Sequence, residues 1–162
     1  MLSLTRKTDY AIVAMADLAR RGASRTSARE VAESTKVPLP VLTNILHKLL
    51  HHGLVTSTMG AKGGYCIAKP PDQINLADMI DAIEGSFKLT VCCESELGQT
   101  DDPCELEENC RVKGPVRRVH SSLRNFLRQV TLAQIAFDSV QIGMALTAGT
   151  GQGERLPVMT PN

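Results

Sequence analysis

Apolar side chains recur along the first half of the chain at intervals of three and four residues, the spacing of one face of an α-helix. Such a stripe over residues 5–20 predicts a first helix, which Gly22 would end. Ser27 and Glu30 have the spacing of a capping box, in which each side chain satisfies a free backbone N–H group. A second helix is therefore expected to begin there.

The stretch after Pro40 has the clearest helical period. Pro40 suits the first turn of a helix, and Gly53 supplies a stop. The face expected to be buried consists of Leu42, Ile45, Leu46, Leu49 and Leu50. The opposite face carries hydrogen-bonding and cationic groups, namely Thr43, Asn44, His47, Lys48 and His51. This third helix should therefore bury one face and offer the other to a partner.

After Gly53 the period changes from that of a helix to that of a strand. The β-branched run LVTST, the turn MGAKGG and the strand-like YCIA predict a short hairpin. Asn75 is expected to cap a fourth helix that ends at Gly85. Three helices followed by a hairpin form the outline of a winged helix-turn-helix.

The second half of the chain predicts a cysteine-bearing loop and then a long helix that begins at Pro115. The stripe of this helix is close to a coiled-coil seam: Val116, Val119, Leu123, Phe126, Leu127 and Val130. A chain of 162 residues has little of its own to cover that stripe, so we expect a homodimer. Thr131 is expected to cap a short final helix.

The expected fold class is mainly α, a winged helix-turn-helix with a long C-terminal dimerisation helix and a cysteine-bearing loop. The expected division of the chain is a DNA-binding domain at 1–85, the loop at 86–113, the dimerisation and terminal helices at 114–146, and a disordered tail at 147–162.

Composition is ordinary for a globular protein, with 43% hydrophobic and 22% charged residues. No stretch approaches the roughly 20 apolar residues of a membrane span, and Arg6, Lys7 and Asp9 stand where a signal peptide would be apolar. We therefore expect a cytoplasmic protein without a membrane partner.

The net charge of +1 hides a segregation of charge along the chain. Residues 1–70 carry ten Lys and Arg against four Asp and Glu, whereas residues 71–113 carry three against eleven. The first segment has the sign that a nucleic-acid surface needs.

We therefore expect the winged helix-turn-helix to bind a double-stranded DNA operator. Thr43, Asn44 and His47 would read bases in the major groove. Contacts to phosphates are expected from Arg6, Lys7, Lys48 and the hairpin tip, where Lys62 is followed by Gly63. Taken singly, each of these residues is better explained by a solvated helix face or an ordinary turn, and it is the order of the elements that favours DNA binding.

Four of the five cysteines lie between positions 92 and 110, which favours a metal or redox site over a disulfide framework. Thiolates suit an iron–sulfur cluster, zinc or cuprous copper, and the absence of a CxxC pair argues mildly against structural zinc. Neighbouring side chains diverge, so Cys92 and Cys93 are not expected to share one cluster. The favoured ligands are Cys92, Cys104 and Cys110, with Cys93 as the alternate to Cys92.

Several motifs together resemble the Rrf2 family of winged-helix transcription regulators. They are LTRKTDYAIVAM, the helix end HHGLV, the wing GAKGGY, the segment LADMIDAIEG and the cysteine triad before a long helix, and they cover residues 1–140. The resemblance implies a homodimer joined by the long helix and a 2Fe–2S or 4Fe–4S cluster bound by three cysteines. The wing and the run VKGPVRR are most similar to members placed beside the Suf cluster-assembly operon.

The fourth cluster ligand varies within that family. IscR-like members have a histidine three residues after the last cysteine, where this chain has Lys113, whose ammonium group is no ligand. NsrR-like members use an aspartate of the first helix of the other subunit, and the matching residue here is Asp9. A surface or capping role for Asp9 is an equal alternative.

The resulting hypothesis is a regulator whose cluster state, set by redox conditions, nitric oxide or iron–sulfur supply, controls operator binding. The alternative is a cluster-free winged-helix regulator that uses its cysteines as a thiol switch or zinc site. An enzyme acting on a small-molecule substrate is not expected, because no phosphate-binding glycine loop or nucleophile elbow is present in the sequence.

Overall fold

The protein is described by a computed structural model that covers residues 4–60, 63–90, 93 and 110–137. The elements, in chain order, are α1 (Arg6–Arg21), α2 (Ala28–Thr35), α3 (Leu39–His51), β1 (Val55–Thr58), β2 (Gly64–Ile67), the 3-10 turn η1 (Pro71–Gln73), α4 (Leu76–Glu84), α5 (Lys113–Gln129) and α6 (Leu132–Ala136). This mainly helical chain with a small two-stranded sheet confirms the expected fold class. The predicted tail at 147–162 lies outside the described residues.

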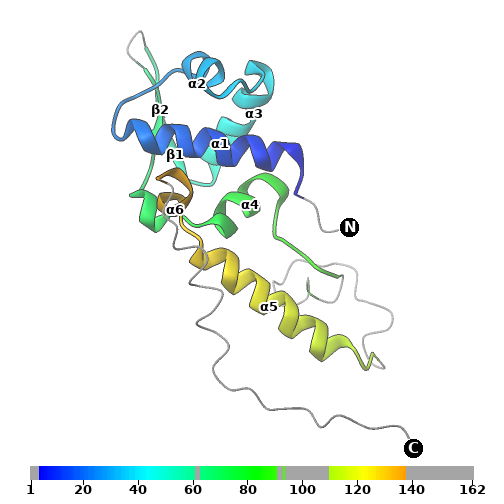
Figure 1. Cartoon of the computed structure of the whole chain (residues 1–162). Coiled ribbons are helices and arrows are strands. Elements are labelled where there is room, and N and C mark those ends of the chain that lie inside the picture. The colour runs from blue at the N-terminus through cyan, green and yellow to red at the C-terminus, as the bar shows by residue number, and fades with distance from the viewer. Residues whose placement is uncertain (1–3, 61–62, 91–92, 94–109, 138–162) are drawn as a thin grey trace, which may run out of the picture.

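Helix α1 runs through the middle of the N-terminal unit, with α2 and α3 on one side and α4 and α6 on the other (Figure 1). Apolar residues of α1 and α3 fill the core between them, and Met15, Leu18, Leu42 and Leu46 have no exposed surface. Four of the five residues expected on the buried face of α3 are buried, but Leu50, in the last turn, is 36% exposed, so that part of the prediction was wrong.

Local signals placed the starts of α2, α4 and α6 correctly. The Ser27 hydroxyl accepts from the Glu30 N–H group, and the Glu30 carboxylate accepts from the Ser27 N–H group, so the capping box is confirmed. The hydrogen bonds of Ser27 lower the pKa of the exposed Glu30 carboxyl. Asn75 and Thr131 cap α4 and α6 as expected, while α5 begins at Lys113, two residues before Pro115.

The predicted hairpin is present as an antiparallel pair in which Val55 faces Ile67 and Thr58 faces Gly64. Thr26, which precedes α2, extends this sheet by exchanging two backbone hydrogen bonds with Tyr65, of 3.0 and 2.8 Å. The base of the wing is thereby attached to the helical core.

Helix α5 leaves the N-terminal unit, and the chain then returns to it (Figure 1). Residues 75 and 131 form an isolated bridge in which Leu76 donates to Val130 and Leu132 donates to Ile74. Helix α6 packs on α1 with Leu132 completely buried. The sequence division grouped α6 with α5, whereas in the structure α6 belongs to the core of the N-terminal unit.

Candidate nucleic-acid interface and cysteine segment

Helix α3 separates its buried and exposed residues onto opposite faces. Leu42 is completely buried, whereas Asn44 and His47 are exposed and, three residues apart, lie on the same side of the helix. Thr43 is half-buried, and its hydroxyl donates to the carbonyl oxygen of Leu39 at 2.9 Å. The core thus fixes the helix axis while a polar face remains open to a partner.

Lys48 of the same helix is engaged within the chain. Its ammonium Nζ donates to the carbonyl oxygen of Ile83 at 2.7 Å. That carbonyl lies in the last turn of α4, where carbonyl groups lack helical partners. A phosphate contact by Lys48, which the sequence led us to expect, would have to compete with this hydrogen bond.

The glycines of the wing are required by the backbone around them. A Cβ atom on Gly64 would lie 2.7 Å from the carbonyl carbon and oxygen of Thr26, and one on Gly63 would lie 2.2 Å from the carbonyl oxygen of Thr58. Glycine is therefore needed at both positions to avoid a clash within the chain, in addition to the expected close approach to DNA. Lys62, at the tip, lies outside the described residues.

The first turn of α1 presents three charged and exposed side chains, those of Arg6, Lys7 and Asp9. Arg6 and Lys7 stand at the surface, as phosphate contacts require. In the part of the chain that the structure describes, the Asp9 carboxylate has no hydrogen bond or ion pair. An outward-facing carboxylate suits both the ligand role and the surface role considered for Asp9.

The same turn is held by a carboxylate from the end of α4. The Thr5 N–H group donates to Glu84 Oε1 at 3.1 Å, and the hydroxyls of Thr5 and Thr8 donate to the same oxygen. Burial alone would raise the pKa of Glu84, but these hydrogen bonds and the charge of Lys48 hold that pKa below its usual range. Glu84 therefore remains a charged acceptor and takes the place of a capping side chain for α1.

Two of the cysteines expected to bind a metal group are described. Cys93 is completely buried, with its Sγ atom 3.4 Å from the hydroxyl of Thr90, and Cys110 is half-buried just before α5. Cys92 and Cys104 lie outside the described residues. Among the described residues alone, no three His, Cys, Asp or Glu side chains gather in a group suited to a metal ion.

The donor set of the segment fits a soft metal centre. Cys110 offers a partly accessible thiol, the kind of ligand that iron–sulfur clusters and zinc take. The burial of Cys93 fits a packing role. Cys66, in β2, instead contacts the hydroxyl of Thr56 at 3.1 Å and belongs to the wing.

Helix α5 is fastened to α4 and to the segment that follows α4. Arg124 donates to Asp81 at 2.6 Å, and the other oxygen of Asp81 accepts from the N–H group of Phe87 at 3.2 Å. His120 Nε2 lies 2.9 Å from the Phe87 carbonyl oxygen, and the two rings are stacked. One face of α5 is thereby committed to this subunit.

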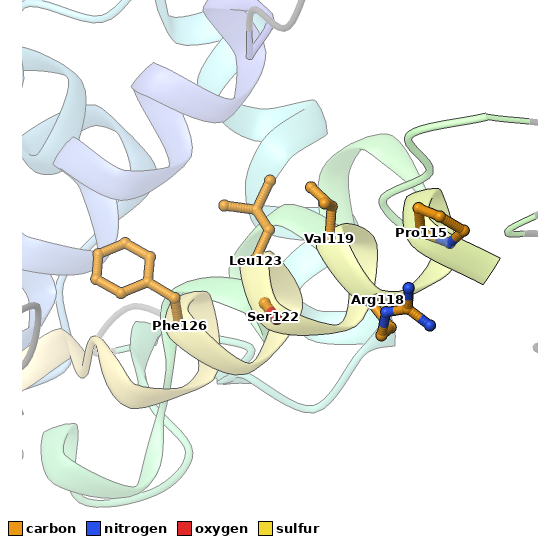
Figure 2. A pocket seen from close by; sticks show the side chains of 6 residues that line it. All are labelled: Pro115, Arg118, Val119, Ser122, Leu123 and Phe126. Carbon is orange, nitrogen blue, oxygen red and sulfur yellow. The ribbon is translucent and has the colours of Figure 1, made fainter. Parts of the chain in front are cut away.

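Another face of α5 is apolar and uncovered. It forms a shallow groove whose walls are shown in Figure 2: Pro115, Arg118, Val119, Ser122, Leu123 and Phe126. The side chains of Val119, Leu123 and Phe126 project on the same side of the helix, and Val119 is 59% exposed. Part of the predicted coiled-coil stripe thus lacks a partner within the described chain, while Val130 is buried in the core.

The helices of the described residues include none that is long and apolar enough to cross a bilayer. What the geometry does define is a protein of the winged helix-turn-helix class: a third helix with a polar outer face, a hairpin wing and a separate long helix. The sequence profile of the Rrf2 family, described as an iron-dependent transcriptional regulator, matches residues 4–138. The chain belongs to the Rrf2 family and is a transcription regulator of that family.

Known relatives agree with this assignment. The chain is 30% identical over 135 residues to the transcriptional regulator IscR of Sodalis glossinidius, covering 83% of this chain and 78% of that protein. It is 27% identical over 138 residues to NsrR of Shouchella clausii, covering 85% and 90%. The structure of CymR, the global cysteine regulator of B. subtilis, matches with a TM-score of 0.65 and 26% identity, covering 86% of this chain and 99% of that one. Rrf2 regulators bind DNA, so the expected class of function is confirmed.

The sequence did not point to the residues that join α1, α3 and α4. Glu84 was one acidic residue at a helix end, and Lys48 was interpreted as a phosphate contact. A signal was present in Thr8, which is polar yet lies among the buried positions of α1. A buried hydroxyl requires a partner, but sequence alone does not say which residue supplies it.

Proposed function

We propose that the chain binds operator DNA as a homodimer and that the state of its cysteine segment controls this binding. The observation that carries the proposal is the division of α3 into a face fixed by the core and an exposed polar face beside a glycine-bounded wing. Thr43, Asn44 and His47 would read base edges in the major groove. The phosphate backbone of the DNA would be contacted by Arg6, Lys7, Lys62 and Gly63.

The uncovered face of α5 supports the homodimer. An apolar stripe that includes Val119, Leu123 and Phe126 is costly to leave in water, and a second copy of the same helix offers a complementary surface. Two copies joined in this way would present two α3 helices to DNA half-sites about one helical turn apart.

The cysteine segment is proposed to hold an iron–sulfur cluster. Cys92, Cys104 and Cys110 would be ligands, with Cys93 as the alternate to Cys92 and Asp9 of the second subunit as the fourth. Such a cluster supplies reversible one-electron chemistry and reactivity toward oxygen and nitric oxide. The chain's own contribution is to connect the segment to α4 at one end and to α5 at the other, so a change in the segment reaches both the DNA-binding unit and the dimer helix.

The second candidate is a regulator that senses through its thiols alone or through zinc. The specific observation in its favour is the likeness to CymR, which is described as a global cysteine regulator. The DNA-binding half of the proposal is common to both candidates.

The deciding experiment is a visible absorption spectrum with iron and sulfide analysis of anaerobically purified protein, alongside single alanine variants of Cys92, Cys104 and Cys110. We expect broad absorbance that each substitution abolishes, while Cys66→Ala retains it. A colourless, iron-free wild-type protein would reject the cluster and leave the thiol or zinc switch.

A further inference from the structure

The end of α4 is joined to two elements of the DNA-binding surface at once. We call this arrangement the α4 joint, and it consists of Thr5, Thr8, Lys48, Ile83 and Glu84. Three donors of the α1 N-terminus converge on one oxygen of Glu84, while the Lys48 ammonium of α3 donates to the carbonyl of Ile83. These contacts join residues 76, 79 and 35 positions apart in the sequence.

The joint holds Thr8 firmly because the buried hydroxyl of this residue has no alternative partner among the described residues. Thr8 has no exposed surface, so water does not replace Glu84 as the acceptor of its hydroxyl. Hydrogen bonds to an ionised acceptor are stronger than those between neutral groups. A displacement of Glu84 would therefore carry the first turn of α1 with it, and that turn holds Arg6 and Lys7.

The α4 joint also lies next to the point where the chain leaves α4 and enters the cysteine-bearing segment. Gly85 ends α4, and three residues beyond Glu84 the backbone of Phe87 is held by Asp81 and by His120 of α5. A shift of α5 or of residues 85–90 is thus transmitted to Glu84 through a short, anchored stretch of chain.

We propose that Glu84 and Lys48 are positioning residues of the DNA-binding surface. They fix the positions of the α1 N-terminus and of α3 relative to the end of α4. This inference rests on the proposed function and deepens it, because it names the contacts through which the cysteine segment acts on DNA binding. Glu84 and Lys48 are assigned no contact with DNA themselves.

The first test compares the DNA-binding affinities of matched variants. The DNA is a duplex that the wild-type chain has selected from a random-sequence library. Thr8→Val removes the buried hydroxyl with little change of shape, and Thr8→Ser retains it. Glu84→Gln removes a charge at the joint, and Asp72→Asn removes one from an exposed position in η1. We expect Thr8→Val and Glu84→Gln to weaken binding about fivefold or more, and the two controls to stay within about twofold of wild type.

Thermal unfolding of the same proteins separates positioning from general loss of structure. Affinities are measured well below the lowest melting temperature, so that every variant is folded. A weakened affinity at this temperature supports the inference. Unchanged affinity for both Thr8→Val and Glu84→Gln, with only their melting temperatures lowered, would show the joint to be structural and overturn it.

Lys48 is tested by the salt dependence of binding. If the Lys48 ammonium bound a phosphate, Lys48→Met would lower the slope of log affinity against log salt by about 0.9, because fewer counterions would be released. We expect the affinity to fall with that slope unchanged. A lowered slope would return Lys48 to the phosphate-binding residues and overturn its assignment here.

The link to the cysteine segment is tested with full-length protein, either reconstituted with ferrous iron and sulfide or stripped by a chelator. The quantity measured is the ratio of the operator dissociation constant of the reconstituted protein to that of the stripped protein. We expect the ratio to approach one in Glu84→Gln. A wild-type ratio of one, or no selective DNA binding, would refute the proposed function itself, whereas a wild-type response that Glu84→Gln retains in full would refute the α4 joint alone.

Discussion

Substituting alanine for Gly64 tests the attachment of the wing to the helical core. The added Cβ atom would lie 2.7 Å from the carbonyl carbon and oxygen of Thr26 and 3.0 Å from its nitrogen. All three are backbone atoms, so no side chain rotation relieves the contact. Thr26 must move away, and its two hydrogen bonds with Tyr65 must lengthen or break.

The magnitude follows from these two effects. Overpacking a close contact costs about 1–3 kcal/mol, and two backbone hydrogen bonds contribute about 1 kcal/mol each. We expect Gly64→Ala to lower the free energy of unfolding by about 3–5 kcal/mol, which corresponds to a fall in Tm of roughly 6–20 °C for a domain of this size.

The assay is thermal unfolding followed by circular dichroism, with Gly114→Ala as the matched control. A Cβ atom on Gly114, in the first turn of α5, would lie 3.8 Å from an Arg118 nitrogen, an ordinary contact. Gly114→Ala should therefore leave Tm unchanged or raise it slightly, since alanine favours helix. A Gly64→Ala protein that melts within about 1 °C of the parent would refute the close approach of Thr26 to the wing.

Three further predictions concern α4 and α5. Asp81→Asn should lower the free energy of unfolding by about 2–3 kcal/mol in urea titrations, because it leaves the largely buried Arg124 without its carboxylate; an unchanged midpoint would show that the ion pair contributes nothing. Leu123→Glu should convert a dimer to a monomer in sedimentation velocity and weaken operator binding, whereas an unaltered dimer would place the interface elsewhere. Glu84 has a lowered pKa in the folded chain, so its contribution to stability is present above the ordinary carboxyl pKa of about 4.3 and is lost as pH falls through the folded value. Glu84→Gln should therefore flatten the acid limb of the stability profile, and an unchanged limb would contradict the depressed pKa.

The sequence by itself determined the elements of this fold and much of its class of function. The stripe of α3, the capping boxes at Ser27 and Thr131, and the cap at Asn75 all depend on residues three or four positions apart. Interactions of that range are decided by local geometry, which is the same in every helix. The family motifs added the winged-helix assignment, which the comparisons confirm.

Only the tertiary structure decided how these elements are joined. Thr26 joins the wing to the helical core by pairing with Tyr65. Helix α6 returns to α1, where Arg20 donates to the carbonyl oxygen of Ala136, 116 positions away in the sequence. Glu84 holds the start of α1. Lys48 shows the difference most clearly: its place on an exposed helix face favoured a phosphate contact, and the structure shows its ammonium group donating to the carbonyl oxygen of Ile83 in α4. Any distant polar group is a candidate partner for such a side chain, and the packing of the whole core selects which one comes within hydrogen-bonding distance.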